Sequence, residues 1–131
     1  MAAPLDPASG ALRSLNAGHN PGLLVPAEGE IVELTAGGMP LGLRTGASYD
    51  SFRLQMDGGG DLLCLYSDGI TECEAPDEEE FGLDRLRDLL CENSELPLPE
   101  ILENIEATTT AFATGQPQGD DQTVVLLRRS A

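Results

Sequence analysis

The pattern of apolar and polar residues predicts several short β-strands in the first part of the chain. Residues 62–66 are five consecutive apolar or aromatic residues, which is typical of a strand buried on both faces. Residues 52–56 alternate between apolar and polar side chains, as a half-buried antiparallel strand does. Residues 22–25 and 30–34 flank a glycine-containing turn and predict a hairpin, and residues 123–127 predict a final buried strand. We therefore expect an antiparallel meander of short strands up to residue 66.

Two amphipathic helices are expected between the last two predicted strands. The first covers about residues 83–91, with Leu83, Leu86 and Leu90 on one face. The second begins near Pro99, a residue suited to a first helical turn, and its apolar face consists of Ile101, Ile105, Thr108 and Phe112. These faces are expected to contact the core rather than a ligand. The acidic segment 72–80 before the first helix is expected to be a solvated loop.

Two further segments are predicted to be loops. Residues 5–10 combine Asp, Pro, Ser and Gly and predict the loop of a hairpin, with residues 12–17 as its returning strand. Few residues precede that loop, so the first strand of the hairpin is expected to be nearly absent. Residues 36–43 contain three glycines and a proline, and we expect this loop to be held against the core by Met39, Leu41 and Leu43.

Composition limits the classes of function. The chain has 131 residues, enough for one domain with a modest core. Its formal net charge is −16, and its basic residues are all arginine. Such a charge disfavours nucleic acid and anionic membranes and favours divalent cations or a basic partner. No apolar run approaches the roughly 20 residues of a membrane span, and no secretion signal is visible. Three cysteines without metal-ligand spacing favour the reducing cytoplasm, with Cys64 as a core residue.

The candidate chemistry lies in two acidic sites next to apolar strands. Asp68 and Gly69 follow the predicted strand 62–66, and Asp120 and Asp121 precede the strand that starts at Thr123. Asp68 could also belong to an ordinary Asp-Gly turn. If the two strands are neighbours in one sheet, the carboxylates meet at one edge. Their natural counter-charge is then a hard cation such as Mg²⁺ or Mn²⁺, and the absence of a His or Cys cluster disfavours zinc.

The only histidine lies in a short loop of small residues. His19 is followed by Asn20 and Pro21, which is typical of a tight loop at the end of a strand. A solvent-facing or structurally hydrogen-bonded histidine is one interpretation. The other is a histidine near a phosphate or a bound water, where proton transfer is possible near neutral pH.

Five ordered motifs resemble one family. The motifs are Asn16-Ala17-Gly18-His19-Asn20-Pro21, Pro40-Leu41-Gly42-Leu43, Tyr66-Ser67-Asp68-Gly69-Ile70-Thr71-Glu72, Phe81-Gly82-Leu83-Asp84-Arg85-Leu86 and Asp120-Asp121-Gln122-Thr123. In their order and spacing they resemble the bacterial serine phosphatases related to stage II sporulation protein E and to the sigma-factor regulatory phosphatases, within the metal-dependent type 2C protein phosphatases.

The resemblance implies both a fold and an activity. The implied fold is α+β, an antiparallel β-sandwich flanked by helices, with two Mn²⁺ or Mg²⁺ ions at one end. The implied activity is hydrolysis of phosphoserine or phosphothreonine on a regulatory protein, typically an anti-sigma-factor antagonist. Asp68 and Asp120, with Asp121 beside it, match metal-ligand positions of the family. His19 and Asn20 match a motif near the site to which we assign no catalytic role, and Gly69 belongs to the Asp-Gly motif.

One part of the family pattern is missing from this chain. The N-terminal acidic motif, whose carboxylate bridges the two metals in the family, has no counterpart before residue 12. The resemblance therefore implies a single, partial phosphatase-like domain over residues 1–131, without its first strands and helices. We expect at most one weakly held cation, little or no activity of this chain alone, and possible self-association through an uncovered sheet face. The alternatives are a non-catalytic acidic binding module and a small cation-binding remnant.

Overall fold

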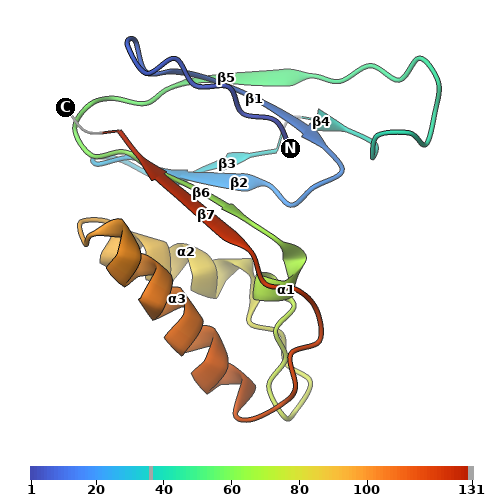
Figure 1. The fold of residues 1–131 in the computed structure, drawn as a ribbon, viewed down its shortest axis with the longest axis vertical. Helices are drawn as coiled ribbons and strands as arrows, with labels where there is room; N and C mark the ends of the chain where they lie inside the picture. Colours follow the sequence, from blue (N-terminus) through green and yellow to red (C-terminus); the bar gives the residue numbers. More distant parts are fainter. Residues whose placement is uncertain (36, 130–131) are drawn as a thin grey trace. The chain divides into compact units, whose positions relative to one another are not determined.

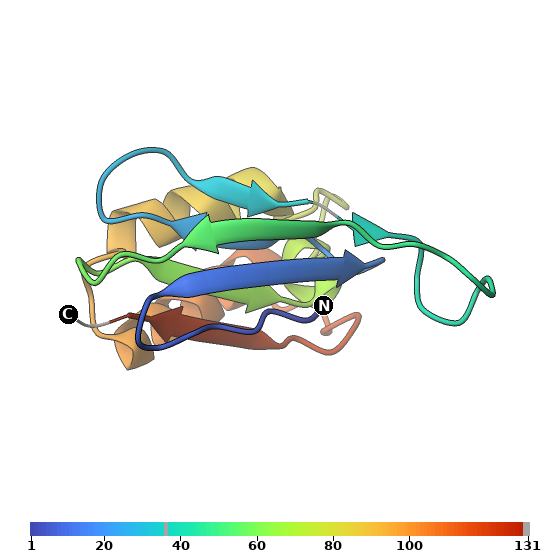
Figure 2. The same ribbon diagram turned by 90° about the horizontal axis from the view of Figure 1, so that it is seen from above.

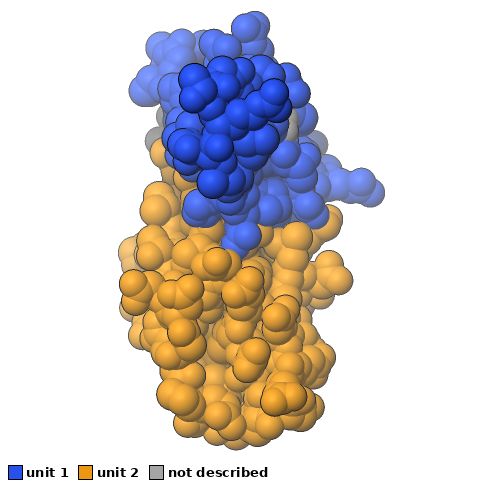
Figure 3. Space-filling model, turned by 90° about the vertical axis from the view of Figure 1, so that its right-hand side faces the viewer, with its two compact units in different colours: residues 1–63, 128–131 blue, residues 64–127 orange. Residues whose placement is uncertain are grey.

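The computed structural model describes residues 1–35 and 37–129, and the chain divides into two compact units (Figure 3). Unit 1 contains residues 1–63 and the C-terminal residues from 128 onwards, and unit 2 contains residues 64–127. Figure 1 labels the helices and strands of both units. The prediction of a single domain over residues 1–131 stays a prediction.

Unit 1 is built from two layers of β-strands. In the first layer, β1 (Ala11–Ala17) pairs antiparallel with β5 (Ser51–Gln55), and Figure 2 shows the two strands side by side. The short strand β4 (Gly37–Gly38) lies on the other side of β1 and pairs with it in parallel. Alternate residues of β1 (Leu12, Ser14, Asn16) are buried, as expected for a strand with one covered face.

The second layer of unit 1 contains the predicted hairpin. Strand β2 (Gly22–Val25) pairs antiparallel with β3 (Val32–Leu34) and lies between β3 and the beginning of β6 (Leu62–Tyr66). All four residues of β2 are buried, which explains its continuous apolar sequence. The carboxylate of the buried Asp61 accepts hydrogen bonds from the amides of Ala27 (2.9 Å) and Asp57 (2.7 Å), which ties two loops together.

Unit 2 combines the rest of β6 with three helices and β7 (Val124–Arg128). Helix α1 (Asp68–Thr71) is a single turn after β6, and the longer helices α2 (Gly82–Asn93) and α3 (Leu98–Ala113) lie on one side of β6 and β7 (Figure 1). The two helices bury Leu86, Leu89, Leu90, Ile101, Ile105 and Thr109. Helix α3 begins with a proline in its first turn, as predicted, and ends at Thr114 in the left-handed conformation (φ 50°).

The α+β class is confirmed, as are both long helices and most predicted strands. The N-terminal hairpin is more complete than predicted, because Ala2 and Leu5 form backbone bridges to Leu15 and Leu12. The acidic loop 72–80 is largely exposed, as expected, and Glu79 forms an ion pair of 2.7 Å with Arg85. Helix α1 was not predicted.

The predicted meander is wrong. β1 pairs with β5, which is far from it in sequence, and β5 belongs to a different sheet from β6. The alternation of residues 52–56 shows only that one face of the strand is covered, and it carries no information about the partner strand.

Three predicted core positions are also wrong. Met39, Leu41 and Leu43 are 41%, 73% and 72% exposed, so they do not hold the loop 36–43 against a core; residue 36 lies outside the described residues.

Thr108 and the final strand also differ from the prediction. Thr108 is exposed, whereas its neighbour Thr109 is buried. The Thr109 hydroxyl tolerates burial because it donates to the carbonyl of Ile105 at 3.0 Å. Strand β7 lies at the edge of its sheet beside β6, and Val125 is therefore 54% exposed rather than buried.

Candidate functional site

Asp68 stands where β6 ends and α1 begins. Ser67 keeps an extended conformation (φ −85°, ψ 159°), and Asp68 is the first residue of the helical turn. The Asp68 side chain is exposed, and its Oδ1 accepts a hydrogen bond of 3.0 Å from the amide of Gly69. The buried strand thus delivers one carboxylate to solvent on a backbone held by the sheet. We call residues 67–69 the Asp68 turn.

Asp120 and Asp121 lie in the loop that leads into β7, and we call residues 119–123 the Asp120 turn. Asp120 Oδ1 accepts a hydrogen bond of 2.7 Å from the amide of Asp121, and the side-chain amide of Gln118 donates to the Asp120 carbonyl at 2.7 Å. Both carboxylates are exposed. This turn therefore presents two acidic side chains in succession.

Hydrogen bonds hold the two turns side by side. The Ser67 amide donates to the Thr123 carbonyl (2.9 Å), and the Thr123 amide donates to the Ser67 hydroxyl (2.9 Å). The same hydroxyl donates to the carbonyl of Asp121 (2.9 Å), and the Gln122 side chain donates to the carbonyl of Gly69 (3.1 Å). The end of β6 thus meets the start of β7, so these neighbouring strands run antiparallel, as the juxtaposition of the acidic sites required.

At Gly69 the backbones of the two turns lie close together. A Cβ added to Gly69 would lie 2.4 Å from the carbonyl oxygen of Asp121, far inside van der Waals contact. The backbones can approach this closely only because residue 69 has no side chain.

His19 and Asn20 belong to unit 1, whereas the two acidic turns belong to unit 2. The buried side chain of Asn16 organises the loop: it donates to the carbonyl of His19 (2.7 Å) and accepts from the His19 amide (2.7 Å). Nδ1 of His19 lies 3.1 Å from the carbonyl oxygen of Asn20, and because a carbonyl only accepts, this contact requires the proton on Nδ1. His19 is exposed, and the contacts within its loop are structural.

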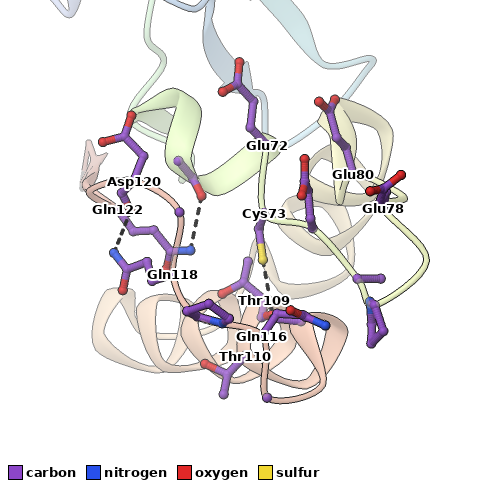
Figure 4. A pocket seen from close by; sticks show the side chains of 18 residues that line it. Glu72, Cys73, Glu78, Glu80, Thr109, Thr110, Gln116, Gln118, Asp120 and Gln122 are labelled. Carbon is purple, nitrogen blue, oxygen red and sulfur yellow. Dashed lines mark hydrogen bonds between the residues drawn. The ribbon is translucent and has the colours of Figure 1, made fainter.

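A cavity of about 670 Å³ lies beside the Asp120 turn (Figure 4). It is formed by the acidic loop after α1, the end of α3 and the loop that leads to β7. Its acidic lining residues are Glu72, Glu74, Glu78, Glu80 and Asp120. Among the described residues that line it there is no Arg or His. The cavity therefore favours cations and, on its own, repels a phosphate group.

Burial makes Cys64 and Cys73 poor nucleophiles. Burial raises the pKa of Cys64 to about 12, so its thiol stays protonated at neutral pH, in agreement with a core role. Burial also raises the pKa of Cys73, whose sulfur lies 3.5 Å from the carbonyl of Thr109. All three cysteines, including the exposed Cys91, are free thiols.

The donors around the two turns suit a hard divalent cation in kind but not in number. Carboxylate oxygens are the ligands that Mg²⁺ and Mn²⁺ prefer. Across residues 1–35 and 37–129, however, no three or more His, Cys, Asp or Glu side chains are grouped so that they could hold a metal. The donor types therefore suit a divalent cation, but the described residues contain no ready-made group of three such ligands.

Comparison with known proteins identifies the family. The family model for Stage II sporulation protein E matches residues 1–130. The chain belongs to the SpoIIE family. The resemblance carried by the five motifs is thereby confirmed.

Two curated relatives of this SpoIIE-family chain extend well beyond the matched region. Protein IcfG of Synechocystis sp. is 31% identical over 126 residues, which are 96% of this chain and 20% of IcfG. Phosphoserine phosphatase RsbU of Bacillus subtilis is 32% identical over 117 residues, which are 87% of this chain and 33% of RsbU. The chain thus spans a fifth to a third of the length of these relatives.

Solved structures share the fold. The SiaA-PP2C domain of Pseudomonas aeruginosa is 25% identical with a TM-score of 0.80, covering 92% of this chain and 47% of that domain. The phosphatase domain of SpoIIE from Bacillus subtilis, in a crystal presoaked with Mn, is 19% identical with a TM-score of 0.74, covering 98% of this chain and 55% of that chain. The chain has the fold of part of a type 2C phosphatase domain. None of its described helices is long and apolar enough to cross a membrane.

Proposed function

We propose that this chain forms part of a metal-dependent protein serine/threonine phosphatase in which Asp68, Asp120 and Asp121 are ligands of Mn²⁺ or Mg²⁺. The observation that carries the proposal is the set of hydrogen bonds between the Asp68 turn and the Asp120 turn. These bonds bring acidic residues more than fifty positions apart in sequence to one end of the β6–β7 pair. Membership of the SpoIIE family supports the same assignment.

The charge of the neighbouring cavity supports the proposed metal dependence. The acidic lining of the cavity opposes the approach of a phosphate dianion, and no Arg among the described lining residues offsets it. A divalent cation held by Asp68 and Asp120 would supply the positive charge that attracts and polarises a phosphoryl group and lowers the pKa of water. The contribution of the chain is to hold exposed carboxylates on two turns fixed by the sheet.

We propose that Asp68, together with Asp120 or Asp121, holds at most one cation, and holds it weakly. A complete site of this family holds two ions, and in it a further carboxylate bridges them. We therefore propose that this chain alone hydrolyses phosphoserine weakly or not at all.

The proposed substrate is a phosphorylated regulatory protein such as an anti-sigma-factor antagonist. Support comes from family membership and from the relative RsbU, which is a phosphoserine phosphatase. Free thiols at all three cysteines support a reducing compartment, and we propose the cytoplasm.

The test is turnover of a phosphoserine protein and of para-nitrophenyl phosphate with millimolar Mn²⁺. We expect turnover far below that of the phosphoserine phosphatase RsbU, and we expect EDTA and Asp68→Asn each to remove it. The control Asp88→Asn changes an exposed carboxylate on α2 and leaves turnover unchanged. Turnover that survives both EDTA and Asp68→Asn would contradict the proposal.

A second candidate function is a non-catalytic acidic binding module or cation-binding remnant. The acidic cavity favours this candidate, because it suits a cationic partner without any chemistry. Absence of turnover after fusion of the chain to a SpoIIE-family N-terminal segment that carries the bridging acidic motif would favour the binding module over the phosphatase.

A further inference from the structure

Ser67 occupies the N-cap position of α1 without capping it. A serine at this position normally accepts a hydrogen bond from an amide of the first helical turn, which contributes about 1 kcal/mol. Here the side chain makes no such bond to α1. Its hydroxyl instead accepts from the amide of Thr123 and donates to the carbonyl of Asp121, both at 2.9 Å. One hydroxyl therefore joins two backbone groups of the Asp120 turn.

The side chain of Gln122 makes a complementary contact in the opposite direction. Its amide donates to the carbonyl of Gly69 at 3.1 Å, so each turn contributes one side chain that binds the backbone of the other. Together with the bond from the Ser67 amide to the Thr123 carbonyl, four hydrogen bonds connect the two turns. We call the side chains of Ser67 and Gln122 the clasp.

The carboxylates themselves make few contacts that could fix their separation. The Asp68 carboxylate accepts a hydrogen bond from the amide of Gly69, and the Asp120 carboxylate accepts one from the amide of Asp121. Each of these bonds stays within its own turn. The relative position of these carboxylates is therefore set by the backbones of the two turns. The clasp is what joins those backbones beyond the end of the β6–β7 pairing.

We propose that Ser67 and Gln122 are positioning residues, which set the geometry of the cation site without contacting the cation. This inference rests on the proposed function, because it assumes that Asp68 and Asp120 share a cation. Removing a group that orients metal ligands typically lowers metal affinity by about 10–100-fold. We expect Ser67→Ala to weaken Mn²⁺ binding by about tenfold, and Gln122→Ala by less, because Gln122 contributes one bond and Ser67 two.

The experiment measures Mn²⁺ affinity by electron paramagnetic resonance of the free ion, in parallel with hydrogen exchange at the Thr123 amide. Ser67→Thr keeps the hydroxyl and should restore both the affinity and the protection of Thr123. The control Ser94→Ala removes a hydroxyl that also donates to a backbone carbonyl (Cys91, 3.1 Å), but at the end of α2. We expect that control to bind Mn²⁺ like the unmodified chain.

The outcomes separate this inference from the function on which it rests. Weakened binding in both Asp68→Asn and Ser67→Ala, with rescue by Ser67→Thr, supports the positioning role. Weakened binding in Asp68→Asn alone overturns the positioning role and leaves the cation site intact. Unchanged binding in Asp68→Asn, or no Mn²⁺ binding by the unmodified chain, overturns the cation site and this inference with it. If Ser67→Ala does not fold, Gln122→Ala decides by the same criteria.

Discussion

Replacement of Gly69 by alanine tests the close approach of the two acidic turns. Gly69 lies in α1 and its φ is not positive, so its backbone conformation is open to alanine. From helix propensity alone, Gly69→Ala would stabilise the chain by up to about 1 kcal/mol. The added Cβ, however, would lie 2.4 Å from the carbonyl oxygen of Asp121, and a backbone atom cannot rotate away as a flexible side chain can.

The expected magnitude follows from what must move. Forcing a methyl group into a filled space costs about 1–3 kcal/mol. If the Asp120 turn shifts to make room, the bonds from Ser67 Oγ to Asp121 and from Gln122 to Gly69 are lost, each contributing about 0.5–1.5 kcal/mol. After subtraction of the helix propensity gain, Gly69→Ala should lower the free energy of unfolding by roughly 1–5 kcal/mol.

The assay is urea denaturation followed by circular dichroism, without metal. Gly119→Ala is the matched control. Gly119 lies in the Asp120 turn, and a Cβ at this position meets no atom of the described residues within 4 Å. We expect that control to stay within about 0.5 kcal/mol of the unmodified chain. A Gly69→Ala variant as stable as the unmodified chain, or more stable, would refute the close packing of the two turns.

Three further predictions concern the core and the acidic residues. Leu63→Ala should lower the free energy of unfolding by about 2–5 kcal/mol, because Leu63 is buried in β6, and thermal melts without metal would show it. In the same melts Asp68→Ala should leave the stability unchanged or raise it slightly, because that carboxylate is exposed and no cation offsets its charge. A larger loss of stability for Asp68→Ala than for Leu63→Ala would contradict both expectations. Iodoacetamide at pH 8 should modify the exposed Cys91 well before Cys64, whose pKa is raised to about 12 by burial, and mass spectrometry showing equal rates would argue against that burial.

The elements that the sequence predicted well are those whose pattern has one physical explanation. Residues 62–66 are continuously apolar because β6 is covered on both faces, and four of the five are buried. Asp68 and Asp120 could be predicted to lie at one edge of a sheet because each adjoins an apolar strand. Their juxtaposition then required that the strands be neighbours and run antiparallel, and both conditions are met.

The elements that the sequence did not predict depend on partners distant in the chain. The alternation of apolar and polar residues in 52–56 indicates that one face of the strand is covered. The pairing of β5 with β1, however, depends on the tertiary structure and not on the local sequence. Leu41 and Leu43 are apolar yet exposed, and a pattern of residue types cannot separate an apolar residue at a surface from one in a core. The roles of Asn16 and Ser67 also went unpredicted, because the contacts of a polar side chain with loop backbones leave no periodic signal.

The most direct test of a cation site at Asp68 and Asp120 is to locate the cation by paramagnetic broadening of amide signals with substoichiometric Mn²⁺. We expect the amides of Gly69 and Asp121 to broaden first, because both lie beside the proposed carboxylate ligands. The amides of α2 around Asp88 should keep their intensity. If the strongest broadening falls instead on residues 74–80 of the acidic loop, or is spread evenly over the chain, then Asp68 and Asp120 do not form the cation site.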